Sequence, residues 1–389
     1  SAQSLRWYYL SEELRGAGFD ITVLAPRISD RWGFNANLSS MIRVERCFPG
    51  PFIGLSGWLA REIHGPRVDV KDAESHSKIS ALSHLQSLSE RLYRLARNTL
   101  NQIIFTDIRS EWYPFGWMAL KRLLREESFD VLVSSFEPGV DLQLGLRAQQ
   151  EFCLPWVVDM ADPLVTIYTP RWRRALDRRF EAKVCTRADH ILVTNANCTQ
   201  ALTSRHGVPK SKFSVVGQGF SEQLELYGKI GAEPNTDIAA DTFTLAFTGN
   251  FYPVFRDPKE LARALCSLNL PHLRFVVAGA DPSYREIFRP LGERLRWLGP
   301  LDHFAALRLQ RKATLLLNIG NRQAEQVPGK LFEYFGARRP ILHIAGSEHD
   351  PAVGLLRSLK RGEACQNRVQ DIATAISRLY VSWERHELD

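Results

Sequence analysis

The sequence predicts an α/β protein made of two doubly wound, Rossmann-like domains that face each other across a cleft. The chain has 389 residues, which is too long for one ordinary hydrophobic core. Two series of short apolar segments alternate with helical segments, a rhythm typical of parallel sheets covered on both faces. An unpatterned stretch at 221–240 separates the two series. Ligands of such sheets bind at the carboxyl ends of the strands, which is where we expect the cleft.

Apolar periodicity places the elements of the two domains. For the N-terminal domain (1–220), we predict strands at 19–26, 129–136, 154–160, 189–195 and 212–220, with helices at 4–17, 78–104, 139–150, 171–187 and 197–206. After a linker (221–240), the C-terminal domain (241–368) is expected to have strands at 242–250, 273–279, 295–301, 313–320 and 339–345, with helices at 257–268, 283–291, 302–311, 328–337 and 351–359. A last helix in 369–389 is expected to pack back on the N-terminal domain.

Composition and cysteine spacing bound the class of protein. Hydrophobic residues make up 44% and charged residues 24%, a balance typical of soluble globular proteins. No run of 18 apolar residues occurs, and the N-terminal residues have no signal-like apolar core. Six dispersed cysteines indicate reduced thiols and no structural zinc. We therefore expect a cytoplasmic protein, with peripheral attachment to the inner face of the cell membrane as a further expectation.

Two segments are basic enough to suggest an anionic partner. The net charge is +7, and the segment 170–187 concentrates cations at Arg171, Arg173, Arg174, Arg178, Arg179, Lys183 and Arg187. This segment is either a solvated helix face or a surface for phospholipid headgroups or a phosphate-bearing acceptor. The helix at 78–104 has a leucine stripe beside arginines, which fits either core packing or a membrane surface. No nucleic-acid motif accompanies these cations.

The stretch AEQVPGKLFEYFGARRPIL (324–342) has the pattern of an anion-binding helix start. Gly329 allows close backbone approach, and the free N–H groups of a first helical turn bind anions such as diphosphates. Lys330 adds a positive charge there. Glu333 lies about one turn deeper on the same face, where its carboxylate can accept both hydroxyls of a ribose. An ordinary buried helix with a surface glutamate explains the pattern equally well on physical grounds.

These residues resemble the Glu-(seven residues)-Glu signature of retaining GT-B glycosyltransferases, in the family-four form found in bacterial polysaccharide assembly. The resemblance implies that Glu333 binds the ribose of a nucleotide-sugar donor and that Lys330 lies near the phosphates. It also implies that Glu325 and the backbone after it contact the transferred sugar. The donor-binding residues implied in this stretch are Gln326, Val327, Gly329, Lys330, Leu331 and Glu333.

Two further stretches resemble the same family in the expected order. FTGNFYPVFRDPKEL (247–261) is similar to the glycine turn after the first strand of the nucleotide domain, with Gly249, Asn250 and Arg256 at the diphosphate-contacting positions. The family commonly has an arginine where Asn250 stands. LRWLGPL (295–301) resembles the loop that contacts the base, which implies roles for Leu298, Gly299 and Leu301.

The N-terminal half resembles the family's acceptor domain. The family's first strand and glycine loop are expected before Ser1. WVVDMADP (156–163) is similar to a strand end that often carries His or Arg where this chain has Ala161. Asp162 is either a helix-capping residue or a catalytic polar group facing the acceptor or the donor sugar. The weaker acceptor-side candidates are Glu137, Asp159, Arg171, Arg173 and Arg174.

The resemblance also implies the chemistry. We expect transfer of a sugar to a glycan or lipid-linked acceptor with retention of configuration, by same-face attack assisted by the leaving phosphate. No Asp-x-Asp motif flanked by strands occurs, so we expect neither a metal nor another cofactor. The diphosphate charge would then be stabilised by Arg256, Lys330 and the helix start. The alternatives are a non-catalytic GT-B protein that binds sugar or nucleotide, and a nucleotide-sugar 2-epimerase.

Overall fold

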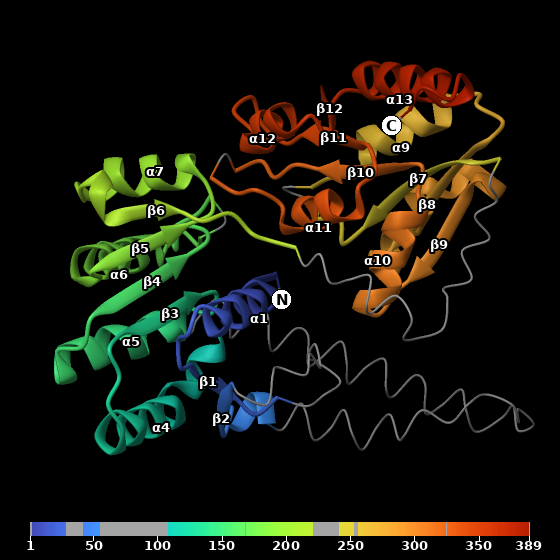
Figure 1. Cartoon of the computed structure of the whole chain (residues 1–389). Helices are drawn as coiled ribbons and strands as arrows, with labels where there is room; N and C mark the ends of the chain where they lie inside the picture. The colour runs from blue at the N-terminus through green and yellow to red at the C-terminus, as the bar shows by residue number, and fades with distance from the viewer. Residues whose placement is uncertain are drawn as a thin grey trace, which may run out of the picture. The chain divides into compact units, whose positions relative to one another are not determined.

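A computed structural model of the chain describes residues 2–28, 42–54, 108–167, 169–220, 241–252, 256–323 and 325–388 (Figure 1). The chain divides into two compact units. The C-terminal unit contains Ser1–Tyr9, Thr194–Ala201 and Val215–Asp389, and the N-terminal unit contains Leu10–Val193 and Leu202–Ser214. The predicted helix at 78–104 and the predicted linker at 221–240 lie outside the described residues. The domain boundaries drawn from the sequence stay a prediction.

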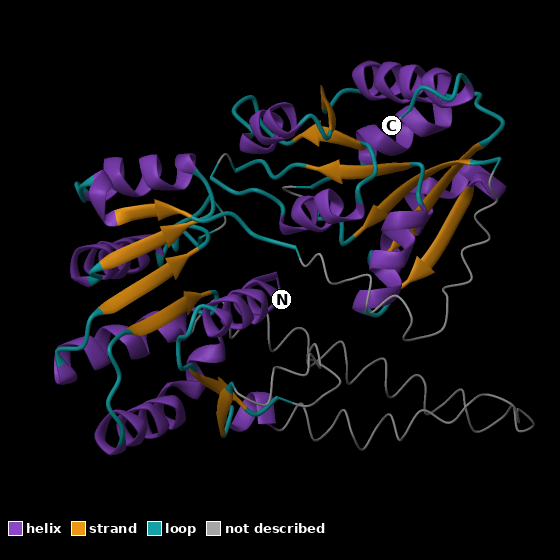
Figure 2. Ribbon diagram, in the orientation of Figure 1, coloured by secondary structure: helices purple, strands orange, loops and turns teal. Residues whose placement is uncertain are grey.

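Helices and strands alternate along most of the described chain (Figure 2). The helices are α1 (Ala2–Gly16), α4 (Tyr113–Glu126), α5 (Gly139–Phe152), α6 (Arg174–Arg187), α7 (Ala196–His206), α9 (Lys259–Ser267), α10 (His303–Lys312), α11 (Gly329–Ala337), α12 (Pro351–Leu359) and α13 (Val369–Glu384). The strands are β1 (Thr22–Pro26), β2 (Arg43–Cys47), β3 (Leu132–Phe136), β4 (Trp156–Met160), β5 (His190–Val193), β6 (Phe213–Val215), β7 (Phe243–Thr248), β8 (Leu273–Ala278), β9 (Leu295–Gly299), β10 (Leu315–Ile319), β11 (Ile341–Ala345) and β12 (Gly362–Gln366).

The C-terminal unit is built on a six-stranded parallel sheet with the order β12-β11-β10-β7-β8-β9. The chain enters at the central strand β7 and runs outward to β9. It then crosses back to β10 and continues to β12. The strand order therefore reverses between β7 and β10. In doubly wound sheets this reversal leaves an opening at the carboxyl ends of the two central strands, where ligands bind.

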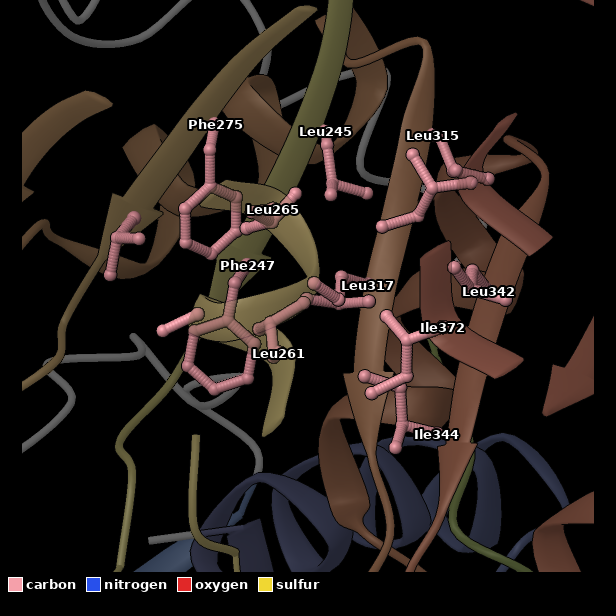
Figure 3. Close-up of a cluster of buried hydrophobic side chains, with 14 of the residues drawn as sticks. Leu245, Phe247, Leu261, Leu265, Phe275, Leu315, Leu317, Leu342, Ile344 and Ile372 are labelled. Carbon is pink, nitrogen blue, oxygen red and sulfur yellow. The ribbon is translucent and has the colours of Figure 1, made fainter. Parts of the chain in front are cut away.

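The core of the C-terminal unit follows from the two-residue period of its strands. Alternate side chains of β7, β10 and β11 point to one face, where α9 and α13 cover them (Figure 3). These buried residues include Leu245, Phe247, Leu315, Leu317, Leu342 and Ile344 from the strands, Leu261 and Leu265 from α9, and Ile372 and Ile376 from α13. The intervening residues Ala246, Leu316 and Ile341 pack with α11 and α12 on the other face. Helix α13, at 369–384, thus belongs to this core.

The N-terminal unit contains a four-stranded sheet with the order β3-β4-β5-β6 and a separate parallel pair, β1 and β2. Helices α4 and α5 pack together over buried Trp117, Val140 and Leu144. Leu24 of β1 and Cys47 of β2 pack against this same cluster. Alternating strands and helices were predicted here, and the structure confirms that pattern.

Two strands and one α-helix of the described residues were not predicted from periodicity. Strands β2 and β12 are short and polar, and β12 has alternating exposure beside β11. Helix α4 begins in the aromatic-rich sequence YPFGWM. A helix predicted at 283–291 is instead a 3-10 segment, Pro282–Arg294. Pro290 removes a backbone donor inside it and Gly292, at φ 56°, interrupts it. Among the described residues, none forms a helix long and apolar enough to cross a membrane.

Candidate functional site

The candidate donor site lies at the carboxyl ends of the strands around the β7–β10 reversal. Gly249 and Gly279 directly follow β7 and β8, and Gly299 is the last residue of β9; their φ values are 140°, 85° and 66°. The Gly249 N–H donates to the carbonyl of Ala278 at 2.9 Å, and the Gly279 N–H donates to the carbonyl of Gly299 at 2.7 Å. A Cβ on Gly279 would lie 3.4 Å from the carbonyl oxygen of Gly249. Glycine is required here because the backbones turn with positive φ and pass close together.

Helix α11 follows β10 and begins at this edge of the sheet. Its first residue is Gly329, and Pro328 is the N-cap with φ −57° and ψ 122°. The sequence had placed Pro328 inside the helix, so that boundary was wrong by one residue. Leu331 and Phe335 lie four residues apart on one face of the helix and are buried in the core. The Leu331 N–H donates to the carbonyl of Pro328 at 2.9 Å, so this residue can offer neither its side chain nor an unbonded N–H to a ligand.

Lys330, on the first turn of α11, is paired with Glu333, which lies about one turn further along the helix. The Lys330 ammonium donates to both Glu333 carboxylate oxygens, at 2.9 and 2.7 Å. The aliphatic stem of Lys330 lies close to Gly249, since a Cβ there would be 3.9 Å from its Cγ. Lysine is unfavourable at a helix start because of the helix dipole, and the carboxylate one turn on offsets this cost.

Glu333 is held from a second side by Gln310 of α10. The Gln310 amide donates to Glu333 Oε2 at 3.1 Å and to the Thr248 hydroxyl, at the end of β7, at 2.8 Å. Gln310 is fully buried. A single glutamine in a helix of mixed polar and apolar residues forms no motif, so the sequence analysis did not identify it. Its two hydrogen bonds fix the Glu333 carboxylate relative to the last residue of the central strand.

Tyr334 links α11 to Thr248 at the end of β7 through hydrogen bonds. Its hydroxyl accepts hydrogen bonds from the Thr248 N–H at 2.9 Å and from the Thr248 hydroxyl at 3.2 Å. Burial raises the pKa of Tyr334 to about 12, although the hydrogen bonds with Thr248 act in the opposite direction. The phenol therefore stays neutral and serves as a fixed support for the adjacent Glu333.

Arg256 reaches from the β7–α9 connection to the β10 end. Its guanidinium donates to Asn321 Oδ1 at 2.8 Å and lies 5.8 Å from the centre of the Tyr252 ring. The Asn321 amide in turn donates to Gln326 Oε1 at 3.3 Å. The structure thus connects two predicted donor residues, Arg256 and Gln326, through an asparagine that the sequence analysis did not identify. A guanidinium held in this way is suited to bind phosphate oxygens.

Asn250 has a structural partner of its own. Its side-chain oxygen accepts a hydrogen bond from the Asp281 N–H at 3.0 Å. This contact joins the turn after β7 to the segment after β8. An arginine, which the family commonly has at this position, has no acceptor atom and could not make that bond.

His303 is a second residue that the sequence analysis missed. It is the first residue of α10, directly after the predicted base-contacting loop, and Asp302 caps the helix by accepting from the Ala305 N–H at 2.8 Å. Burial lowers the pKa of His303, partly opposed by the negative charge of Glu333. The imidazole is therefore neutral at pH 7 beside the Lys330–Glu333 pair.

The remaining predicted donor residues border these groups. Leu298 and Leu301 pack against Leu309, Val276 and Ala278. Glu325 and Val327 are half-buried in the connection from β10 to α11, and Gly329 is half-buried at the first position of that helix. These residues are brought to one edge of one sheet, and their contacts with a ligand remain predictions.

A buried triad supports β10 and β11 behind this edge. His343 bonds to Asn318 through Nδ1 at 2.7 Å and to Asp350 Oδ2 through Nε2 at 2.9 Å. Asp350 also accepts from the N–H groups of Gly346 at 2.9 Å and Ala352 at 3.0 Å. Burial acts to raise the pKa of Asp350, but these hydrogen bonds outweigh it and the pKa is lowered.

The acceptor-side candidates belong to the N-terminal unit and differ in exposure. Asp159 is fully buried within β4, and Asp162 is half-buried just after that strand. Glu137 is exposed and lies 3.5 Å from Arg109. The three predicted arginines differ in exposure and in their bonding partners. Arg171 is exposed, Arg173 pairs with buried Asp177 at 2.8 Å, and Arg174 donates to the carbonyl of Thr169 at 3.3 Å.

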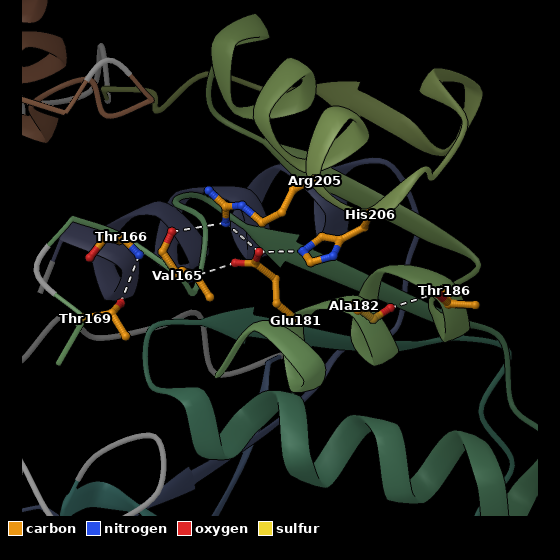
Figure 4. A network of polar contacts seen from close by, with 8 residues as sticks. All are labelled: Val165, Thr166, Thr169, Glu181, Ala182, Thr186, Arg205 and His206. Atoms are coloured by element: carbon orange, nitrogen blue, oxygen red, sulfur yellow. Dashed lines mark hydrogen bonds and ion pairs between the residues drawn. The ribbon is translucent and has the colours of Figure 1, made fainter. Parts of the chain in front are cut away.

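The loop that carries Asp162 is anchored by a buried carboxylate, Glu181 of α6 (Figure 4). Glu181 accepts from the Val165 N–H at 2.7 Å, from Arg205 at 2.6 Å and from His206 Nε2 at 2.6 Å. Arg205 also donates to the Val165 carbonyl at 3.1 Å. Both backbone groups of Val165 are therefore tied to side chains of α6 and α7, which fixes the path of the chain after β4.

No group of three or more histidine, cysteine, aspartate or glutamate side chains is placed to hold a metal ion within the described ranges. Arg256 and Lys330 are two cationic groups that the structure places at the strand ends.

The chain matches the family model described as a glycosyl transferase 4-like domain over residues 2–219, more than half of its length. Among curated proteins, none matches. Similar solved structures include sucrose-phosphate synthase from Thermosynechococcus elongatus, with a TM-score of 0.60, 16% identity and coverage of 96% of this chain and 83% of that one.

A second similar structure is Anabaena HepE in complex with UDP, with a TM-score of 0.54, 14% identity and coverage of 70% and 74% of the two chains. A third is a putative UDP-N-acetylglucosamine 2-epimerase from Listeria monocytogenes, with a TM-score of 0.51, 15% identity and coverage of 70% and 71%. At these identities the likeness shows the fold, which is GT-B, as the sequence predicted.

Proposed function

Because this chain belongs to the glycosyl transferase 4-like family, we propose that it moves a sugar from a nucleotide-sugar donor to a glycan or lipid-linked acceptor. One observation carries the proposal for the donor site. An ammonium, Lys330 on the first turn of α11, is paired with a carboxylate, Glu333 at the start of the next turn, at the strand-order reversal of a doubly wound sheet. That edge is where such sheets bind nucleotides.

Each group at the edge has a distinct task in donor binding. Glu333 would accept hydrogen bonds from the two ribose hydroxyls, because a carboxylate held by Gln310 is a fixed, charged acceptor. Lys330 would move part of its contact from Glu333 to the diphosphate, which also lies at the start of α11. Arg256 would bind the diphosphate from the opposite side of the reversal. The HepE structure bound to UDP is consistent with this placement only at the level of the fold.

The proposed reaction retains the configuration of the transferred sugar and uses no metal or other cofactor. As the donor bond breaks, negative charge grows on the leaving diphosphate. Arg256, Lys330 and the N–H groups at the start of α11 would stabilise that charge as fixed groups. Retention would follow from acceptor attack on the face that the diphosphate leaves, with the departing phosphate taking the acceptor proton. Glu325 and Asp162 are the residues that we assign to the sugar and the acceptor hydroxyl.

The test of the donor site is calorimetric titration of UDP, GDP, TDP and ADP into the wild-type protein and a Glu333→Ala variant. We expect one nucleotide to bind with a Kd of about 1–100 µM and the variant to bind it at least about tenfold more weakly, since a charged hydrogen bond contributes about 1.5–3 kcal/mol. Binding that the variant leaves unchanged would remove Glu333 from the site. The absence of binding by all four nucleotides would refute the donor site.

A second measurement separates transfer from the two alternatives. Incubation of the matching nucleotide sugar with acceptor should release free nucleotide with time and leave the sugar at C2 unchanged. A protein that binds nucleotide but releases none under these conditions would be a non-catalytic GT-B member. Conversion of the donor sugar at C2 would indicate a 2-epimerase. Activity that survives excess chelator supports the metal-free mechanism, and activity abolished by it contradicts that mechanism.

A further inference from the structure

Helix α6 and the turn before it carry a surface that the proposed donor chemistry does not use. The outward side chains are Arg171, Trp172, Arg174, Leu176, Arg178, Arg179, Lys183 and Arg187. The helix contains two acids, Asp177 and Glu181, and both are fully buried. Asp177 is paired with Arg173 and Glu181 with Arg205, so neither reaches the outer face. The exposed side of α6 thus carries cations without neighbouring anions of its own.

The helical period arranges part of this surface as a line. Leu176, Arg179, Lys183 and Arg187 follow one another at spacings of three and four residues, which places them along one face of the helix. The N–H groups of Arg173 and Arg174 both bond to the carbonyl of Pro170 at 3.0 Å, so helical bonding begins before Arg174. Trp172 therefore lies one turn before Leu176. We call the line of these five residues, Trp172 to Arg187, the α6 stripe.

The stripe has an apolar end and a basic end. Trp172 is 55% exposed and Leu176 is 48% exposed, while Ile167, in the loop just before, is 57% exposed. Arg174 holds that loop through the carbonyl of Thr169. At the other end, Arg179, Lys183 and Arg187 make no ion pair with any of the described residues. Large apolar side chains beside unpaired cations are unusual on a surface that contacts water alone.

We propose that the α6 stripe is a docking surface for an anionic lipid bilayer. The cations match the negative charge of acidic headgroups, each contributing to binding near the surface. Trp172 and Leu176 fit the boundary between headgroups and acyl chains, where tryptophan is enriched. Nucleic acid would also attract the cations, but its phosphate backbone offers no apolar environment for the exposed aliphatic side chains of Leu176 and Ile167. This inference does not depend on the transferase reaction, because it rests on groups outside the donor site.

The test measures binding of the whole protein to sedimented vesicles of pure phosphatidylcholine and of phosphatidylcholine with about 30% phosphatidylglycerol. We expect binding at least about tenfold tighter to the anionic vesicles. The double variant Arg179→Glu/Lys183→Glu should lose about tenfold or more of that affinity. Its matched control is Arg285→Glu/Arg289→Glu, which reverses two exposed charges at the same spacing on the 3-10 segment of the C-terminal unit. The control should bind as the wild type does.

A second readout does not depend on the folding of the charge variants. Vesicles made with brominated lipids quench tryptophan fluorescence at the bilayer boundary, so bound wild-type protein should be quenched. A Trp172→Phe variant should still bind but lose most of the quenching. Equal binding to neutral and anionic vesicles, equal losses in the two charge-reversal variants, or unchanged quenching without Trp172 would each overturn the proposal. Tighter binding to a single-stranded RNA than to anionic vesicles at the same salt concentration would overturn it in favour of nucleic acid.

Discussion

The Lys330 ammonium contacts both oxygens of the Glu333 carboxylate, at 2.9 and 2.7 Å. A ribose that binds to Glu333 must share or displace those contacts, and a diphosphate at the start of α11 offers the lysine a new partner. The ammonium thus holds the Glu333 carboxylate in one position. In the proposed donor site the ribose would contact Glu333 and the phosphates would contact Lys330. The two contributions to nucleotide affinity can therefore be measured separately.

A Lys330→Met variant should distinguish the contribution of the phosphates to binding from that of the ribose. UDP should bind about 10- to 100-fold more weakly, because a charged contact to phosphate contributes about 1.5–3 kcal/mol. Uridine, which has no phosphate, should bind at least as well as to wild type, because Glu333 is released from the ammonium. Calorimetry with both ligands measures this, with Lys330→Arg as the charge-preserving control. Equal losses for uridine and UDP would contradict a phosphate role for Lys330.

Gln310 is expected to act as a positioning residue for Glu333. Replacing it by leucine removes the donors to Glu333 and Thr248, at a cost of about 1–3 kcal/mol in unfolding free energy. The Gln310→Leu loss of nucleotide affinity should not change with pH. In Gln310→Glu a second carboxylate faces Glu333, so one of the two takes up a proton at a raised pKa. The nucleotide affinity of Gln310→Glu should therefore fall as the pH rises from about 5 to 8. An affinity that does not change with pH would show that the contact between residue 310 and Glu333 does not affect nucleotide binding.

Sequence periodicity predicted the C-terminal sheet well because four of its six strands are buried on both faces. The apolar runs of β7, β8, β10 and β11 have no other stable placement. Strands β2 and β12 were missed for the opposite reason. Arg43, Glu45 and Glu363 make them polar, and they are ordered by one neighbouring strand. Helix α4 was missed because its aromatic start obscures the helical period.

The sequence predicted those parts of the candidate site whose residues lie on one helix at helical spacing. It did not predict the parts that come from different elements. Lys330 and Glu333 stand on one face of a helix, so their meeting follows from the spacing alone. Gln310 and His303 come from another helix, and Asn321 from the end of a different strand. The hydrogen bonds of Gln310 with Glu333 and of Asn321 with Arg256, and the electrostatic influence of Glu333 on His303, arise from tertiary packing, which leaves no local pattern in the sequence.

Asp350 should contribute to stability in a pH-dependent way. Its pKa is lowered below the ordinary 3.8 in the folded protein, so its contribution is fully present above 3.8 and is lost as the pH falls through the lower folded value. An Asp350→Asn variant should be less stable by about 1–3 kcal/mol near neutral pH. The difference in urea midpoint between variant and wild type should shrink as the pH falls toward 3. A difference that stays constant with pH would show that the charge of Asp350 is not what stabilises the triad.

Glu181 should be required to order the loop after β4. Glu181→Gln leaves Arg205 without its carboxylate in a largely buried site, a change that costs about 3–5 kcal/mol when a buried pair is broken. Removing both charges in Glu181→Gln/Arg205→Met should recover part of that loss. Urea denaturation compares the two variants. Hydrogen exchange at the Val165 amide should be faster in both, and an unchanged rate there would show that Glu181 does not hold the loop.

Gly249, Gly279 and Gly299 have no side chains of their own to cover the main-chain groups at the ends of β7, β8 and β9. For a nucleotide bound at this edge, the base would be distinguished by the direction of carbonyl and N–H groups. Such a preference cannot be altered by exchanging one side chain for another. During evolution, related enzymes would therefore acquire a different donor base by inserting or deleting residues in these turns, while retaining the residues that contact ribose and phosphate.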